Sequence, residues 1–183
     1  MNTSVADRLV LDPAAAQGYG PGDLAAAIMR GPVLVSGTAK SSAGPVVAAV
    51  DDDDNPGDIL RYAAAQARRL GVPLRVVHVW AGRRNRHDTI SDADRLLSAV
   101  LYDHLTPDQA AAAEREIRHD DDVVRALTAL SAGAALLVIA ARRRPTTGSG
   151  PLGSTARALL GSTACPVAVL PPNAEPALGA NAW

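Results

Sequence analysis

Residues 45–80 read PVVAAVDDDDNPGDILRYAAAQARRLGVPLRVVHVW, and this stretch decides the fold of the chain. It opens with an apolar run at 46–50 that lacks polar alternation, which is typical of a strand buried on both faces. A helix is predicted from Pro56, and Gly71 stands where the left-handed residue after a helix belongs. A second apolar strand is predicted at 74–80, so the stretch forms a strand–helix–strand unit.

The alternation of strands and helices continues along the chain. Ser91 and Asp94 resemble a capping box at the start of a helix, and Thr106 with Pro107 has the pattern of an N-cap followed by a first helical residue. Helical patterns also occur at 123–133 and around 156–160, and further strands are predicted at 115–118, 135–141 and 167–170. The pattern indicates an α/β fold: an open five-stranded parallel sheet with helices on both faces.

The chain of 183 residues is expected to contain one such domain, with additions at both ends. We expect an N-terminal extension or arm at 1–43, the α/β domain at 44–172 and a C-terminal tail at 173–183. The arm is rich in Ala, Gly, Pro and Ser, and only a short helix at 23–29 and the run at 33–35 stand out. That run is expected either to add one edge strand or to lie across a partner subunit.

Composition excludes several classes of function. The net charge is −1 and phenylalanine is absent, so a non-specific nucleic-acid binder with base-stacking side chains is not expected. Cys165 is the only cysteine, which rules out an intramolecular disulfide and a cysteine-based zinc cluster. The first residues lack the apolar core of a signal peptide, and the uncharged run at 126–141 is short for a membrane span. We therefore expect a cytoplasmic protein without a membrane or nucleic-acid partner.

Two stretches of the chain resemble the universal stress protein family. The unit at 45–80 has that family's first strand ending in Val-Asp, its Ala-rich helix and its second strand ending in Val-His-Val. The closing run at 135–171, ALLVIAARRRPTTGSGPLGSTARALLGSTACPVAVLP, contains the most distinctive part, with LGS followed by CPVAVLP. The resemblance covers about residues 44–172. It implies the family's fold, an adenine nucleotide alpha hydrolase-like sheet.

The resemblance also implies where a nucleotide would bind. Many members of the family bind ATP through a Gly-x-x-Gly, nine residues, Gly-Ser/Thr pattern, in which backbone N–H groups wrap the phosphates. Gly153 and Ser154 match the closing pair of this pattern. The two opening glycines are replaced by Ala140 and Arg143, and the arginine places a long cation in the pocket.

Two further positions match the family near the base and the ribose. Asp51 matches the acidic residue near the ribose and adenine, and Val79 matches the residue beside the base. Asp51 is followed by three more aspartates, and an arginine triplet at 142–144 follows another predicted strand. These strands are neighbours in the family's sheet, so arginine side chains would fill the space that phosphates occupy in relatives. The other interpretation is that both runs are solvated loop charge.

The resemblance implies a stress-response or regulatory binding module. Together with the departures at Ala140 and Arg143, it predicts a protein that has no catalytic residues, resident cofactor or metal and that binds ATP weakly or not at all. One alternative is an ATP- or AMP-binding switch with slow ATP hydrolysis, in which Arg143 contacts phosphate. Another is an accessory subunit whose arm docks on a larger protein partner. The likeness also implies a homodimer through the last strand, an apolar edge formed by Val167, Ala168, Val169 and Leu170.

Other candidate sites have simpler structural interpretations. The G-x-G-x-x-G at 148–153 is best explained as a flexible loop. His119 and the aspartates at 120–122 could join Asp51 and its neighbours around Mg²⁺ or Ca²⁺, but helix capping by Asp122 is the simpler interpretation. His78 is expected to be a satisfied core residue. Cys165 is expected to serve packing rather than nucleophilic catalysis.

Overall fold

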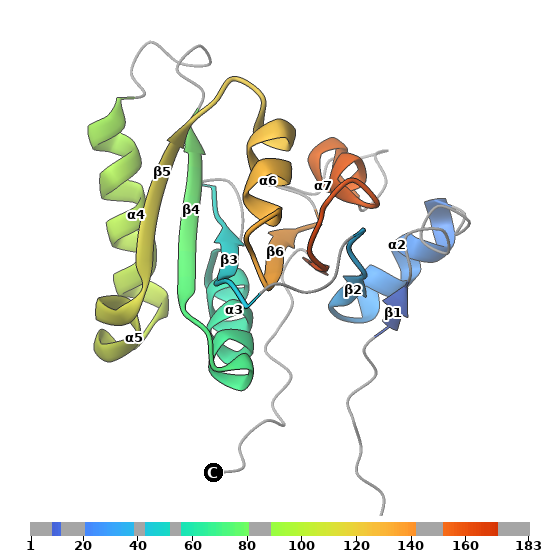
Figure 1. Cartoon of the computed structure of the whole chain (residues 1–183), viewed down its shortest axis with the longest axis horizontal. Coiled ribbons are helices and arrows are strands. Elements are labelled where there is room, and N and C mark those ends of the chain that lie inside the picture. The colour runs from blue at the N-terminus through green and yellow to red at the C-terminus, as the bar shows by residue number, and fades with distance from the viewer. Residues whose placement is uncertain are drawn as a thin grey trace, which may run out of the picture.

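The computed structural model describes residues 9–11, 21–38, 43–51, 56–80, 89–141 and 152–171. The strands are β1 (Leu9–Leu11), β2 (Val33–Val35), β3 (Val46–Ala49), β4 (Leu74–Trp80), β5 (Glu114–His119), β6 (Leu136–Ala140) and β7 (Val167–Leu170). The helices are α2 (Pro21–Arg30), α3 (Pro56–Leu70), α4 (Ile90–His104), α5 (Pro107–Ala112), α6 (Val123–Ser131) and α7 (Ser154–Leu159). The described strands form one sheet in the order β1-β2-β7-β6-β3-β4-β5 (Figure 1).

The centre of this sheet is the predicted parallel five-stranded unit. β3 pairs in parallel with β4 on one side and with β6 on the other, and β5 and β7 extend these pairs outward. The α/β architecture with helices on both faces is therefore confirmed. The predicted count of five strands is too low, because β2 and β1 of the N-terminal arm extend the sheet beyond β7.

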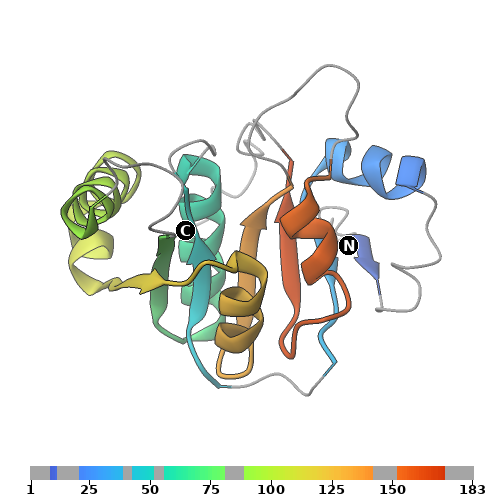
Figure 2. The same cartoon turned by 90° about the horizontal axis from the view of Figure 1, so that it is seen from above.

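Helices cover the sheet on both faces and bury one core on each (Figure 2). The α3-side core lies between the sheet and helices α3 and α4, and includes Val46, Ala48, Ile59, Leu60, Leu97 and Leu136. The α6-side core lies between the sheet and helices α6 and α7, and includes Val47, Leu127, Leu137, Ile139, Leu159 and Val167. Successive residues of β6 alternate between the two cores, as expected for a strand buried on both faces.

Local sequence signals explain most of the helix boundaries. Gly71 follows α3 with a φ of 67°, the left-handed conformation predicted for it. Thr106 caps α5 and Pro107 is its first residue, also as predicted. The capping box of α4 is formed by Thr89 and Asp92, so the predicted pair two residues further along is wrong. Among the described helices, none combines the length and apolarity that a bilayer crossing needs.

The two edges of the sheet have different chemistry. At β5, charged side chains form a ladder with β4: Arg75 Nε lies 2.7 Å from Glu114 Oε2. Glu116 carboxylate oxygens lie 3.6 Å from Arg75 Nη1 and 3.3 Å from Arg118 Nη1. Charged residues on an edge strand oppose pairing with another chain, because a partner strand would have to desolvate them. The β5 edge is therefore suited to face solvent rather than to pair with a strand of another chain.

The opposite edge of the parallel unit is covered by the arm. β2 pairs antiparallel with β7, so the run at 33–35 adds an edge strand, one of the two roles expected for it. The expectation that Val167–Leu170 is the edge strand of the sheet is therefore wrong, since β7 is paired with β6 on one side and β2 on the other. The homodimer through this strand stays a prediction. In this fold, a dimer of that kind can form only if β2 separates from β7.

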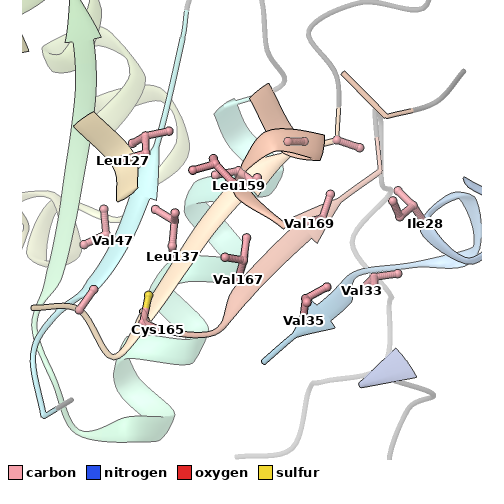
Figure 3. Packing of buried hydrophobic residues seen from close by; sticks show 14 of the residues in the cluster. Ile28, Val33, Val35, Val47, Leu127, Leu137, Leu159, Cys165, Val167 and Val169 are labelled. Carbon is pink, nitrogen blue, oxygen red and sulfur yellow. The ribbon is translucent and has the colours of Figure 1, made fainter. Parts of the chain in front are cut away.

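Apolar side chains of the arm belong to the α6-side core. Ile28 of α2 is fully buried, and Val33 and Val35 of β2 are 1% exposed (Figure 3). They lie beside Val167 and Val169 of β7, which occupy the same core. The described part of the arm thus shares a hydrophobic core with the domain, and burial of these side chains stabilises both.

Replacing Ile28 by alanine should lower the free energy of unfolding of the whole chain by roughly 2–5 kcal/mol, the usual cost of truncating a fully buried aliphatic side chain. The same substitution at Ile90, which is 63% exposed, should cost less than about 0.5 kcal/mol. Chemical denaturation followed by circular dichroism measures both. An unchanged midpoint for Ile28→Ala would show that the arm is separate from the domain, as its composition suggested.

Candidate functional site

Four of the family-matched positions lie around the carboxyl edge of the central strands. Ala140 ends β6, Asp51 lies two residues beyond β3, and Val79 is near the end of β4. The backbone N–H of Gly153 donates to the carbonyl oxygen of Ala141 at 2.7 Å, which fixes the start of α7 beside the end of β6. Because β6, β3 and β4 are consecutive and parallel, their carboxyl ends meet at one edge. This is where open α/β sheets bind ligands.

Gly153 and Ser154 form the beginning of α7. Gly153 is the N-cap residue, and no side chain makes a capping hydrogen bond there. Ser154 is exposed and begins the helix. The first backbone N–H groups of a helix have no partner within the helix, so this turn can present donors to an anion. The closing Gly-Ser of the predicted pattern thus has the local geometry that the resemblance implies.

The methyl group of Ala140 does not point toward α7. Ala140 packs against the α3-side core, whereas Leu152, just before α7, packs against the α6-side core. The extra Cβ at this position therefore lies on the face of the sheet opposite to the helix that would hold phosphates. Its replacement of glycine is a mild departure from the family pattern.

The other departure, Arg143, lies outside the described residues, as do the two arginines beside it and the aspartates at 52–54. Residues 148–151 of the G-x-G-x-x-G stretch are also outside the described part. What the structure adds is the pairing of the strands that precede these runs. Asp51 follows β3, Arg142 follows Ala141 in the sequence, and β3 and β6 are hydrogen-bonded neighbours.

Carboxylates near this edge are held by cations and backbone groups. Asp58, in the first turn of α3, is 7% exposed and forms an ion pair with Arg61. Asp120, after β5, lies 2.6 Å from Arg125 and accepts a hydrogen bond from the backbone N–H of Asp122. That backbone hydrogen bond, with a contribution from Arg125, lowers the pKa of Asp120. Both arginines are thus already engaged with carboxylates.

The acidic residues after β5 have a structural role. Asp122 is the N-cap of α6, and its side chain accepts a hydrogen bond from the backbone N–H of Arg125 at 3.0 Å. This confirms the capping interpretation of Asp122. Among the residues that the structure describes, no group of three or more His, Cys, Asp or Glu is arranged to hold a metal ion.

His78 links two central strands. Its Nδ1 lies 3.0 Å from the carbonyl oxygen of Val50, and the side chain is buried. A carbonyl oxygen only accepts, so Nδ1 carries the proton and donates it to Val50. The bond ties the end of β4 to the residue that precedes Asp51. The prediction of a satisfied core histidine is confirmed.

One pair of side chains at this edge was missed by the sequence reasoning. The rings of Trp80 and His119 lie with centroids 4.7 Å apart at an interplanar angle of 53°. They are the last residues of β4 and β5 and are direct partners in the register. Trp80 Nε1 is buried and has no hydrogen-bond partner among the described residues. Each residue could be assigned to a strand end, but their contact depends on a register that the sequence pattern does not specify.

Cys165 lies before β7, at the opposite end of the sheet from this edge. It is 1% exposed and belongs to the α6-side core (Figure 3). Burial raises the pKa of its thiol from about 9 to about 11. A thiol that stays protonated is a poor nucleophile, so the prediction of a packing role agrees with its position.

The comparisons with known proteins agree with this geometry. The model of the Universal stress protein family matches residues 43–171. A universal stress protein from Archaeoglobus fulgidus is 29% identical, with a TM-score of 0.57, over 69% of this chain and 97% of the relative. The structure of the universal stress protein from Archaeoglobus fulgidus in complex with dAMP is 27% identical, with a TM-score of 0.54, over 69% of this chain and 96% of that one.

A more distant structure shares the fold alone. Universal stress protein UspA from Lactobacillus plantarum is 15% identical, with a TM-score of 0.52, and the match covers 72% of this chain and 99% of that one. No protein with curated annotation matches this chain. Nearly the whole length of each of these three solved relatives matches about seven-tenths of the chain. The family model begins at residue 43, so the arm before it lies outside the residues that this model matches.

At neutral pH the Cys165 thiol of the folded chain should resist alkylation, and it should react fully in denaturant. Because the unfolded chain loses this proton near pH 9 and the folded chain near pH 11, the free energy of unfolding should fall as the pH rises through that interval. Mass spectrometry after timed labelling checks the first expectation, and denaturation at several pH values checks the second. Equal labelling rates for folded and unfolded protein would contradict a buried thiol.

Proposed function

Because the chain belongs to the universal stress protein family, we propose that it is a stress-response regulatory module that acts by binding rather than by catalysis, and that it binds ATP weakly or not at all. The observation that carries the proposal is the pairing of β3 with β6. The acidic run that begins at Asp51 and the arginine triplet that begins at Arg142 follow these two neighbouring strands. Opposite charges at adjacent strand exits can neutralise one another where a nucleotide would need the cations.

The charge balance at the carboxyl edge supports this proposal. Asp51, Asp58 and Asp120 all contribute carboxylates there, and Arg61 and Arg125 are engaged with two of them. Among the described residues, a triphosphate approaching α7 would therefore meet carboxylates, and the arginines paired with two of them are already engaged. At about 4 Å and an effective dielectric constant near 20, one such repulsion is worth about 4 kcal/mol gross, and less where water reaches the pair.

Three described side chains with catalytic potential have structural roles. The His78 ring is buried against Val50, the Cys165 thiol is buried in the α6-side core, and Asp122 caps a helix. A general base or nucleophile must reach its substrate, so these positions support a binding role rather than a catalytic one.

The second candidate is an adenine-nucleotide switch with slow ATP hydrolysis. Two observations favour it: a relative of similar fold has been solved with dAMP, and α7 begins with an uncapped Gly-Ser beside the end of β6. The Ala140 methyl group lies on the other face of the sheet and leaves this turn open. In this candidate Arg143 contacts phosphate and aids binding instead of blocking it.

Calorimetric titration with ATP and Mg²⁺ should give weak or undetectable binding by the intact chain. If Arg143 is the obstacle, Arg143→Ala should raise the affinity by about tenfold or more, equivalent to ~1.4 kcal/mol. Ala140→Gly should have little effect, because its methyl group faces the α3-side core. The matched control is Arg157→Ala, which removes the same charge from an exposed position of α7.

The two candidates give opposite results in this titration. A micromolar dissociation constant for the intact chain, lost in Arg143→Ala and kept in Arg157→Ala, would reject the proposal and establish the nucleotide switch. Nucleotide that co-purifies in stoichiometric amount would do the same. A stoichiometric second protein would instead favour the accessory subunit that docks through its arm.

A further inference from the structure

The short segment between α7 and β7, residues 160–166, is held from two sides. From the arm, the backbone N–H and the hydroxyl of Thr38 both donate to the carbonyl oxygen of Thr163, at 3.0 and 3.1 Å. From α6, the hydroxyl oxygen of Ser131 accepts a hydrogen bond from the backbone N–H of Ala164 at 2.9 Å. Thr163 and Ser131 are both buried, so water has little access to replace these partners. This segment, the α7–β7 turn, is therefore held between the arm and α6.

Gly37 brings the arm into close backbone contact with the α7–β7 turn. An added Cβ at Gly37 would overlap the carbonyl oxygen of Ala164 and the carbonyl carbon of Cys165. Both atoms belong to the backbone and cannot rotate away, so this approach requires glycine. Gly31, before β2 in the same arm, meets no atom within 4 Å when a Cβ is added. The close approach is thus a property of the position next to the turn.

Helix α7 depends on its neighbours because it has only six residues, Ser154–Leu159. A helix of this length is not stable in water by itself. Its buried residues Ala156 and Leu159 enter the α6-side core, which they share with Ile28 of the arm. In the view of Figure 3, Val169 of β7 lies between Leu159 and Ile28. The arm therefore contributes to the core that holds α7, and it also holds the chain that leaves this helix.

The opposite end of α7 lies at the carboxyl edge of the sheet. The backbone N–H of Gly153 donates to the carbonyl oxygen of Ala141 at 2.7 Å, and the carbonyl oxygen of Gly153 accepts from the backbone N–H of Arg157 at 3.0 Å. Six helical residues span ~9 Å, so α7 is a short rigid connection between Gly153 and the α7–β7 turn. A displacement of the turn is therefore transmitted to the carboxyl edge.

We propose that the arm is an intramolecular clamp on α7, and that the arm and the carboxyl edge regulate one another through this helix. While the arm is docked, α7 and Gly153 are held in place. When the arm separates, α7 opens while β3, β4 and β6 stay paired. The family match begins at residue 43, so the clamp lies outside the residues that the family model matches.

The regulatory part follows from thermodynamic linkage. A ligand that needs α7 in its folded position favours the docked arm, and the docked arm favours that ligand to the same extent. The use of α7 by a ligand rests on the nucleotide site considered under the proposed function. The clamp itself rests on the contacts of Thr38, Gly37 and the α6-side core.

Amide hydrogen exchange of the full chain without nucleotide tests the clamp, because it reports local opening residue by residue. Thr38→Val removes the hydroxyl donor to Thr163 and should speed exchange at Gly153 and Arg157 about 3- to 10-fold, the factor expected for one lost hydrogen bond. Thr38→Ser keeps a hydroxyl and should restore the wild-type rates. Exchange at Ala63, in the middle of α3, should not change. Equal acceleration at Ala63 and Arg157, or none at either, would overturn the clamp.

A second pair of variants tests the close approach. Gly37→Ala introduces the backbone overlap and should speed exchange at Gly153 by about tenfold or more, whereas Gly31→Ala should leave it unchanged. Circular dichroism and the rate at Ala63 show whether the rest of the sheet stays folded. A Gly37→Ala chain that is folded and keeps the wild-type rate at Gly153 would overturn the proposal. If Gly37→Ala does not fold, the Thr38 pair decides the same point.

Titration with ATP and Mg²⁺ tests the regulation of the edge. In the Arg143→Ala background, where the proposed obstacle to binding is absent, adding Gly37→Ala should weaken the affinity about threefold or more, and adding Gly31→Ala should not. If the intact chain is the one that binds, the same comparison is made there. Equal affinities would overturn the regulatory part. Absence of binding in both backgrounds would overturn it as well, together with the charge explanation of weak binding, whereas the clamp is decided by exchange without nucleotide.

Discussion

In the middle of the sheet β3 pairs in parallel with both β4 and β6, and each connection that leaves this centre must cross one face or the other. The chain that leaves β3 crosses through α3 on one face, and the chain that leaves β6 crosses through α7 on the opposite face. Their paths diverge at the carboxyl edge, which is the kind of position where open α/β sheets bind ligands. The position of Asp51 and Ala140, the charge runs that follow them, and the placement of both cores all depend on this one pairing.

Elements that depend on local chemistry could be predicted from the sequence. The apolar strands, the start of α3 at Pro56, the left-handed Gly71 and the Thr106–Pro107 cap each follow from a few neighbouring residues. The capping box of α4 could not be decided in this way, because two overlapping segments fit the pattern and only one of them begins the helix. β1 was beyond prediction as a sheet strand, and β2 was predicted only as one of two possible roles, since three residues are too few to show a period.

The candidate site shows the same division between local and long-range information. Family-matched positions could be assigned to strand ends and to the start of α7, and four of them lie around one edge. The direction of the Ala140 methyl group could not be known, because it depends on which face of the sheet each residue of β6 meets. The contact of Trp80 with His119 depends on the register between β4 and β5, which is set by packing across the whole sheet.

β2 and β7 pair in the folded protein, but they are synthesised at different times. Thr38 and Thr163, which hold the arm in place, are separated by 125 positions in the chain. At a synthesis rate of ~5–20 residues per second, β7 leaves the ribosome on the order of ten seconds after β2. During that interval β2 lacks its antiparallel partner β7, and the α6-side core cannot close. Completion of this sheet therefore depends on β7, the last of the described strands to be synthesised, so a chain that stops before β7 leaves the apolar strand β2 without its partner and exposed to quality control.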